Sequence, residues 1–227
     1  MNNDPNNHPL PGNLLGTIYK GGIIVPVIQT LLLTVLALSV ERFFTIRAAF
    51  GRGKLVKFVA QIKEALTRGD LDAAQALCDK QRGSVANVVG STLRKYREME
   101  QATDLTKDQK ILAIQKELEE ATALELPMMQ QNLPIIATIT TLGTLMGLLG
   151  TVIGMIKSFA ALSAGGGTDS VALSTGISEA LINTAFGILT GALAVIAYNY
   201  YTNKIDKLTY SLDEVGFSIV QTYASTH

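Results

Sequence analysis

The sequence has little of what most active sites require. Its 227 residues include one cysteine and two histidines. A single cysteine, Cys78, excludes an internal disulfide bond and any CxxC metal or redox motif, and its plain interpretation is a small apolar residue in a helix. His8 and His227 lie at the chain ends, whereas a histidine-assisted nucleophile, a haem site or a zinc site needs a histidine held inside a fold. We therefore expect no enzymatic activity, no metal and no cofactor.

Charge is scarce and balanced. Only 17% of the residues are charged, against about 25% in an average soluble domain, while the hydrophobic share of 48% is ordinary. Nineteen Lys and Arg residues balance nineteen Asp and Glu residues, which removes the electrostatic case for a nucleic-acid partner. Because the hydrophobic content is ordinary overall, the charge must be missing locally.

The missing charge is concentrated in three runs. Gly21–Val40 has 20 uncharged residues, Leu126–Ile156 has 31, and Ser170–Asn203 has 34 residues with Glu179 as the one charged residue. A membrane-spanning helix needs about 20 apolar residues, so each run is a candidate span in the lipid bilayer. At 1.5 Å per residue, the second and third runs exceed the ~30 Å hydrocarbon layer, which predicts that they extend into water at one end.

Two alternatives would explain these runs without three spans. The first alternative is that the runs are core helices of a soluble protein. Such helices keep charged residues on one side, which these runs do not. The second alternative is that Gly21–Val40 is a cleaved signal peptide, since Ala37-Leu38-Ser39 loosely fits a cleavage site. Against this, Met1–Leu10 carries no Lys or Arg, and basic residues follow the run directly. That pattern is typical of a retained anchor with its N-terminus outside.

The basic residues also predict an orientation. Of the 19 Lys and Arg residues, 15 lie in residues 41–132, and the positive-inside rule places this insert and the C-terminus in the cytoplasm. We predict an all-α integral membrane protein whose long second and third transmembrane helices extend into a cytoplasmic helical bundle. The predicted order is a periplasmic N-terminal segment 1–20, transmembrane helix 21–40, cytoplasmic helical insert 41–132, transmembrane helix 133–156, short periplasmic link 157–173, transmembrane helix 174–203 and cytoplasmic tail 204–227.

The insert carries helix-start signals. Asp70 is a candidate cap for a helix over Leu71–Gln81, and Ser84 is a candidate cap for a helix that ends near Glu100. We interpret residues 41–132 as a bundle that extends the membrane helices. A docking platform for another protein is the alternative.

A further helix start precedes the second span. Thr106-Lys107-Asp108-Gln109 has the spacing of a capping box, in which Thr106 and Gln109 satisfy each other's backbone N–H groups. We expect the helix that begins there to continue into the second span despite Pro127 and Pro134.

One face of the second span consists of small and hydroxyl residues. They recur at intervals of four and three residues, as expected for one face of a helix. The stripe contains Thr140, Thr144, Gly147, Thr151, Gly154 and Ser158. Small residues let helix backbones approach closely, so the plain interpretation is helix packing, here against the third span of a neighbouring subunit. Alternatively, its hydroxyl groups line a hydrated path.

The third span contains Glu179, the one acidic or basic residue deep in any of the runs. An intramembrane carboxylate costs about 2.5–3.5 kcal/mol on insertion scales, so it usually faces a bundle interior or water and marks an ion path. Asn183 and Thr190 lie roughly 40° and 20° from Glu179 on a helical wheel, which makes a polar face, whereas Thr184 is about 140° away. The face of Thr184 also carries Gly187 and Gly191. An interfacial position of Glu179 near the outer mouth is the alternative.

Two motifs in these spans resemble a known family. Leu145–Ile156, with the sequence LMGLLGTVIGMI, and Gly176–Gly187, with the sequence GISEALINTAFG, are together similar to the MotA/TolQ/ExbB proton channel family, above all its ExbB branch. The three-span layout extends the resemblance over most of the chain. It implies a bacterial inner-membrane motor subunit, with its N-terminus periplasmic and its C-terminus cytoplasmic. It further implies a homopentamer around the single transmembrane helices of two ExbD-like subunits.

The resemblance also implies a function and site residues. Proton flow through the unit would energise a TonB-like protein and so TonB-dependent uptake across the outer membrane. By position, Thr151 and Thr184 match the pore threonines of the family and Glu179 its channel-proximal glutamate. We add Asn183 and Thr190 to the candidate ion pathway, because they share a face with Glu179.

Three other functions remain as alternatives. The same type of motor would serve a TolQ-like or a gliding function, or the chain would be a passive membrane scaffold without proton conduction. An intramembrane enzyme would need a catalytic pair within the spans, and none of the spans contains His, Asp or Cys.

Overall fold

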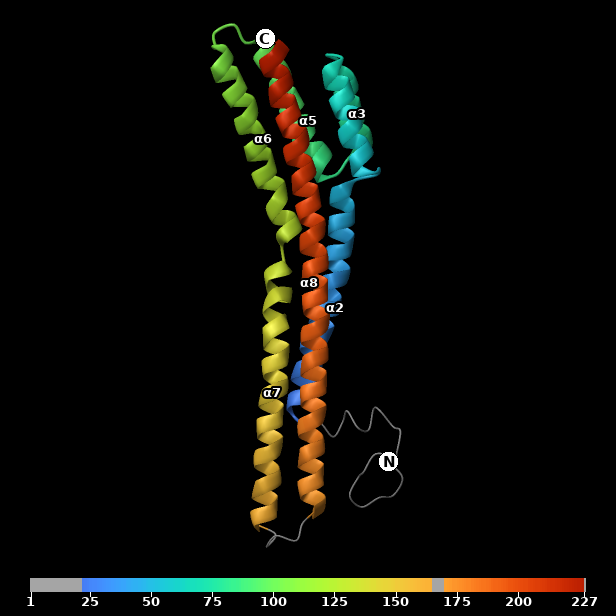
Figure 1. Cartoon of the computed structure of the whole chain (residues 1–227), viewed down its shortest axis with the longest axis vertical. Helices are drawn as coiled ribbons and strands as arrows, with labels where there is room; N and C mark the ends of the chain where they lie inside the picture. Colours follow the sequence, from blue (N-terminus) through green and yellow to red (C-terminus); the bar gives the residue numbers. More distant parts are fainter. Residues whose placement is uncertain (1–21, 165–169, 227) are drawn as a thin grey trace. The chain divides into compact units, whose positions relative to one another are not determined.

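The computed structural model describes residues 22–164 and 170–226, and all regular elements in these ranges are α-helices (Figure 1). They are α2 (Ile24–Phe50), α3 (Leu55–Thr67), α4 (Leu71–Gln81), α5 (Ser84–Gln101), α6 (Lys107–Gln130), α7 (Leu133–Ala164) and α8 (Ser170–Thr226). The all-α prediction is confirmed. The predicted periplasmic segment 1–20, both histidines and positions 165–169 of the predicted link lie outside the described residues.

The chain divides into two compact units. The first unit comprises residues 1–39 and 133–199, and the second comprises residues 40–132 and 200–227. Helices α2 and α8 each contribute to both units. The charge-poor runs fall mainly in the first unit, whereas most of the charged insert lies in the second.

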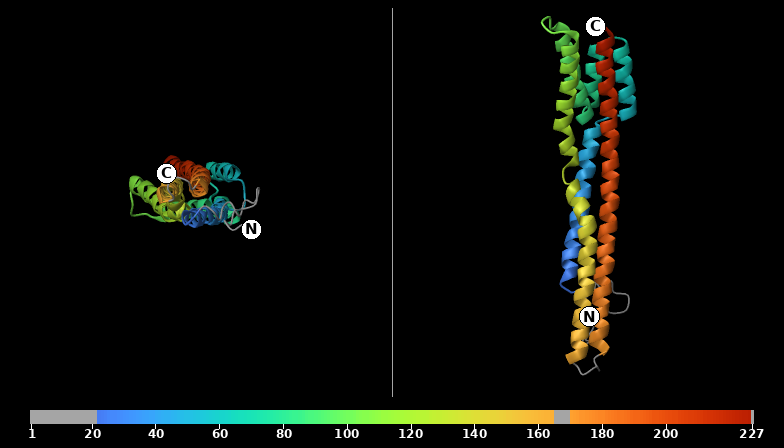
Figure 2. Two further views of the ribbon diagram at one scale, coloured as in Figure 1. Left: turned by 90° about the horizontal axis from the view of Figure 1, so that it is seen from below. Right: turned by 60° about the vertical axis from the view of Figure 1, so that its left-hand side comes forward.

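The first unit holds α7 and the first half of α8 side by side (Figures 1 and 2). Three described stretches are long and apolar enough to cross a membrane, and they lie within Ile24–Thr67, Lys107–Ser163 and Leu173–Thr226. Large apolar side chains such as Leu33, Leu145 and Ile188 are mostly exposed to the surroundings of the chain. Such faces suit contact with lipid, and the prediction of three potential membrane spans is confirmed.

The helices of this unit are longer than the predicted spans. Helix α7 continues to Ala164 and α8 begins at Ser170, so much of the predicted link 157–173 is helical. The membrane boundaries themselves stay a prediction.

In the second unit, α3, α4, α5 and α6 pack with the last half of α8. Aliphatic side chains of the core, among them Ile62, Val85, Ile114 and Leu212, are almost fully buried. The Tyr223 hydroxyl of α8 donates a hydrogen bond to the backbone oxygen of Met99 in α5 at 3.1 Å. This unit is therefore a helical bundle with an apolar core of its own.

Local helix-start signals are mostly confirmed. Asp70 accepts a hydrogen bond from the backbone N–H of Ala73 at 2.8 Å, and the capping box that Thr106 opens is formed in full. Ser84 is not a cap. It is the first residue of α5, and the preceding Gly83 occupies the cap position with a φ of +86°.

The expectation of one continuous helix into the second span is wrong. Helix α6 includes Pro127 but ends at Gln130, and α7 begins at Leu133. Between them, Asn132 adopts a positive φ of +65°, a conformation that asparagine tolerates better than most residues. Pro134 then lies in the first turn of α7, where a missing N–H costs nothing.

Candidate functional site

The contact between α7 and α8 in the first unit is unusually close. A Cβ atom built on Gly147 would lie 2.9 Å from the Cα of Gly187, and one built on Gly154 would lie 2.9 Å from the Cβ of Ala180. Real Cβ atoms do not approach other atoms this closely, so each position requires glycine at the present helix separation. The two helices therefore meet backbone to backbone.

This contact differs from the expected one. The prediction assigned the small stripe of α7 to the third span of a neighbouring subunit, but its glycines face α8 of the same chain. A Cβ on Gly191 would lie 2.8 Å from the backbone oxygen of Thr140 and 2.6 Å from the Thr144 hydroxyl. At the other end, Ser158 is buried beside Gly176. The stripe is thus used within one subunit.

Two threonines meet in the middle of this contact. The hydroxyl groups of Thr151 and Thr184 lie within hydrogen-bond distance of each other, and either can be the donor. The Thr151 hydroxyl also lies 3.2 Å from the backbone oxygen of Gly147, and the Thr184 hydroxyl lies 3.3 Å from that of Ala180. Since a hydroxyl group donates one proton and accepts two, this pair can relay hydrogen bonds without itself becoming charged.

Glu179 is paired with a cation that the sequence analysis did not assign to it. Lys157 Nζ of α7 lies 2.9 Å from Glu179 Oε1 of α8. The Glu179 side chain is 14% exposed, whereas that of Lys157 is 52% exposed. Gly22 covers the carboxylate, because a Cβ there would lie 1.7 Å from Oε1. The site is therefore a shielded carboxylate with a counter-ion that is about half exposed at the surface of the chain.

Asn183 and Thr190 do not share an open polar face with Glu179. Both are buried in the contact with α7, with exposures of 1% and 0%. Thr190 donates to the backbone oxygen of Phe186 at 2.8 Å. The Asn183 amide lies against Gly150 and has no hydrogen-bond partner among the described residues. An unpaired buried amide costs about 1–3 kcal/mol, so Asn183 is the least satisfied polar group of this contact.

The pairing of Lys157 with Glu179 has a signal in the sequence. The contacts Gly147–Gly187, Thr151–Thr184 and Lys157–Glu179 all have their sequence midpoint at or between positions 167 and 168. Two antiparallel helices joined by a short link pair residues that are equally far from its centre. Applied to Glu179, this rule finds Lys157, which a wheel of α8 alone cannot reveal.

The described part of the first unit holds two acidic or basic side chains, Lys157 and Glu179. Within residues 22–164 and 170–226, no group of three or more His, Cys, Asp or Glu side chains is placed to hold a metal ion. The chemistry available in the described part of the first unit is therefore proton exchange at one carboxylate, an ion pair, and hydrogen bonding through hydroxyl groups.

The sequence of this site matches a family model, described as the MotA/TolQ/ExbB proton channel family, over residues 85–214. The match covers more than half of the chain and includes both members of the threonine pair and of the ion pair. The chain belongs to this family. It is therefore a multi-pass membrane protein of a proton channel family and not an enzyme.

Individual relatives carry two different names. The chain is 30% identical over 192 residues to the "Putative biopolymer transport protein ExbB-like 1" of Synechocystis sp., covering 82% of this chain and 69% of the relative. It is 26% identical over 192 residues to the "Tol-Pal system protein TolQ" of Pseudomonas aeruginosa, covering 80% and 81%. These identities establish the family. They do not distinguish its ExbB members from its TolQ members.

A more similar relative matches over a shorter segment. The "Putative biopolymer transport protein ExbB-like 3" of Synechocystis sp. is 37% identical over 86 residues, which cover 37% of this chain and 41% of the relative. The aligned segment thus spans less than half the length of that protein.

Proposed function

We propose that this chain is the scaffold and channel subunit of an ExbB-like motor in the bacterial inner membrane. Together with an ExbD-like partner and a TonB-like protein, it uses the proton gradient to energise TonB-dependent transport across the outer membrane. The family match and the ExbB-like relatives support this proposal. In this arrangement the N-terminus is periplasmic, and residues 41–132 and the C-terminus are cytoplasmic.

One observation carries the proton-coupled part of the proposal. Glu179 is the one carboxylate in the described part of the first unit, and it lies in the apolar helix pair that also holds the hydroxyls of Thr151 and Thr184. A carboxylate can bind and release protons, whereas threonine hydroxyls only orient water and relay hydrogen bonds. Glu179 is thus the proton-binding group, and the threonine pair belongs to the path that leads to or from it.

The same observation implies a second component. One carboxylate can bind a proton but does not by itself give it access to two sides of the membrane in turn. Each proton that crosses a 100 mV potential releases about 2.3 kcal/mol, and using that energy requires an element that moves when its charge is neutralised. A single-span ExbD-like helix with a membrane aspartate supplies this element. It lies inside a homopentameric ring of this chain.

Proton flux in liposomes tests this two-component mechanism. We expect little flux with the purified chain alone and regulated flux after the ExbD-like partner is reconstituted with it. Replacing the membrane aspartate of the partner should abolish the added flux. Robust flux from the chain alone would contradict the mechanism and favour an autonomous channel, and no flux in either case would favour a passive scaffold.

Growth assays separate the ExbB-like from the TolQ-like function. Under iron limitation, a strain that lacks this chain should fail to grow on TonB-dependent iron sources, and Glu179→Asp should restore growth better than Glu179→Ala. Normal iron-limited growth together with a leaky outer membrane would instead assign the chain to a TolQ-like system, for which the TolQ relative is the supporting observation.

A further inference from the structure

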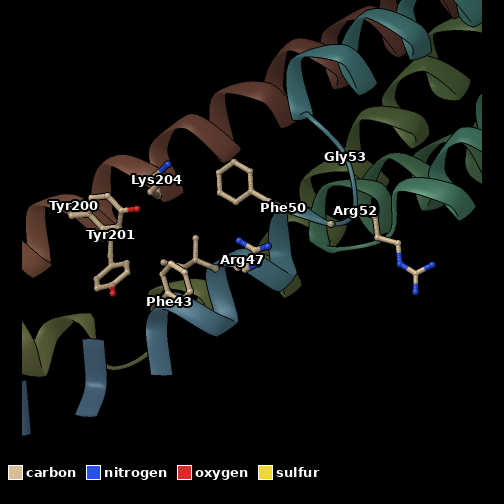
Figure 3. Close-up of a pocket in the computed structure, with 10 residues that line it drawn as sticks. Phe43, Arg47, Phe50, Arg52, Gly53, Tyr200, Tyr201 and Lys204 are labelled. Carbon is tan, nitrogen blue, oxygen red and sulfur yellow. The ribbon is translucent and has the colours of Figure 1, made fainter. Parts of the chain in front are cut away.

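The second unit contains a cavity that the proton path does not use. It has a volume of about 380 Å³ and lies between the end of α2, the segment that follows it, and α8. Aromatic side chains of Phe43, Phe50, Tyr200 and Tyr201 line it, together with Arg47 and Lys204 (Figure 3). Arg52 also contributes to the lining, but its guanidinium group points away from the aromatic side chains.

The cavity is positively charged and its charge is not compensated. None of its lining residues is acidic. Among the described residues, no carboxylate lies within ion-pair distance of Arg47 or Lys204, although other basic residues of this unit, such as Lys63 and Arg97, do form ion pairs. Lys204 Nζ lies 5.6 Å from the centre of the Tyr200 ring, which leaves its N–H groups available to an anion. The site therefore favours a negatively charged ligand.

The walls of the cavity are fixed by backbone contacts. Gly51 has a φ of +75°, and a Cβ there would lie 2.1 Å from the backbone oxygen of Arg82. The Gln81 side chain donates to the last carbonyl of α2, that of Phe50, at 2.9 Å, and the Gln81 backbone oxygen accepts from the Arg52 N–H at 2.8 Å. Because these groups satisfy the end of α2, Arg47 is not needed there to bind free carbonyls.

The sequence pattern predicts that this cavity lies near the level of the lipid headgroups. The uncharged run of α2 ends at Val40, and that of α8 ends at Asn203. The lining residues after Val40 begin at Phe43, and those of α8 lie on both sides of Asn203. They are therefore in the part of each helix where the apolar sequence gives way to charged sequence. Tyrosine and basic side chains are enriched at this level of membrane proteins, where phosphate groups of lipids are concentrated.

We propose that this cavity binds the phosphate group of an anionic phospholipid. Arg47 offers a planar fork of donors to phosphate oxygens, and Lys204 adds a second positive charge. The aromatic side chains contact the glycerol region of the lipid. The proposal depends on the membrane-spanning helices and not on proton coupling, so lipid binding and motor function can fail separately.

Native mass spectrometry tests this site, with the full-length protein first delipidated and then mixed with one lipid at a time. We expect dioleoyl phosphatidylglycerol to remain bound at stoichiometric amounts and dioleoyl phosphatidylcholine to dissociate. Arg47→Gln and Lys204→Gln should each weaken phosphatidylglycerol binding about fivefold, and the double variant roughly thirtyfold, because each charge near the lipid surface contributes similarly. Arg68→Gln is the matched control and should retain wild-type binding, since Arg68 is an exposed arginine of the same unit that does not line the cavity.

Three outcomes would overturn the proposal. The first is equal retention of the two lipids, and the second is equal weakening by Arg68→Gln and Arg47→Gln, which would indicate general surface charge. In the third, inorganic phosphate in excess displaces the lipid and binds as tightly by itself, which would assign the cavity to free phosphate. An unchanged thermal midpoint of each variant shows that the loss is not caused by unfolding, and Lys204→Gln alone suffices if the double variant does not fold.

Discussion

Lys157 Nζ of α7 lies 2.9 Å from Glu179 Oε1 of α8, so the proposed proton-binding carboxylate rests against a cation of its own chain. The Lys157 side chain is 52% exposed, and for such a pair the net stabilisation is at most about 1 kcal/mol. The pair therefore does little for folding. Its effect is to hold the carboxylate in a defined position while Glu179 is ionised.

A charge swap separates the structural role of this pair from proton binding. We expect Lys157→Glu to lower the thermal midpoint, because two carboxylates then face each other, by the equivalent of about 1 kcal/mol. The double variant Lys157→Glu with Glu179→Lys should restore the midpoint but not the growth under iron limitation. Growth of the swapped variant would mean that a carboxylate at position 179 is not the proton-binding group.

The backbone contact at Gly147 should not tolerate a larger side chain. Even an alanine Cβ would lie 2.9 Å from the Cα of Gly187, and leucine must push α7 and α8 apart. We expect Gly147→Leu to destabilise the first unit by about 1–3 kcal/mol, which a lower thermal midpoint would show. Thr141→Leu, at an exposed position of α7, is the control. A thermal midpoint of Gly147→Leu equal to that of Thr141→Leu would contradict this account.

Asn183 and Thr190 should differ in their effect on proton flux, although both are buried. Thr190 is satisfied by the Phe186 carbonyl, whereas the Asn183 amide has no partner among the described residues. If this amide donates one hydrogen bond to the proton path during transport, we expect Asn183→Ala to lower partner-dependent flux roughly tenfold and Thr190→Val to leave it unchanged. Equal fluxes in the two variants would show that the Asn183 amide does not contribute to the path.

The accuracy of the sequence predictions depended on the range of the interactions. The cap at Asp70 and the capping box at Thr106 involve neighbours three residues away, so the sequence contains all the information they need. The break at Asn132 and the partner of Glu179 depend on residues far along the chain. A wheel of one helix grouped Asn183 with Glu179, because it does not record that α7 covers Asn183 and leaves Glu179 beside Lys157.

The Cys78 thiol should be unreactive until its bundle unfolds. It is 4% exposed, and burial together with the nearby Asp79 carboxylate raises its pKa to about 12 from an ordinary value of 9.0. Only the thiolate reacts with maleimides, so labelling at pH 8 should follow global or local opening. Rapid labelling of the folded protein would show that α4 opens readily.

The same shift gives stability a pH dependence. The unfolded thiol ionises above pH 9.0, whereas the folded thiol stays neutral up to about 12, so the unfolded state is favoured as the pH rises through this window. We expect the free energy of unfolding to fall between these pH values, and to fall less in Cys78→Ala, which has no thiol. Parallel pH profiles of the two proteins would contradict the burial of the thiol.

The end of α6 should depend on Arg42 of α2. This arginine is 1% exposed, and its guanidinium donates to the backbone oxygens of Met128 at 3.0 Å and Met129 at 3.2 Å. These carbonyls belong to the last turn of α6, where no further helical N–H group is available to them. Glu41 holds the guanidinium from the other side and also accepts from the Asn132 side chain at 3.4 Å. Arg42 thus stabilises the end of α6. The sequence alone predicts that this helix continues beyond that point.

We expect Arg42→Met to destabilise the second unit by about 1–3 kcal/mol, because it keeps the apolar stem but leaves the carbonyls of Met128 and Met129 without their donor. Arg52→Met, a change of a nearby exposed arginine, should shift the thermal midpoint far less. Hydrogen exchange should locate the loss at the last turn of α6, since opening there exposes N–H groups that Arg42 indirectly protects. If exchange rises evenly over the whole unit while the α6 end keeps its relative protection, the guanidinium contributes only general packing, and the helix break at Asn132 is maintained by its own backbone conformation.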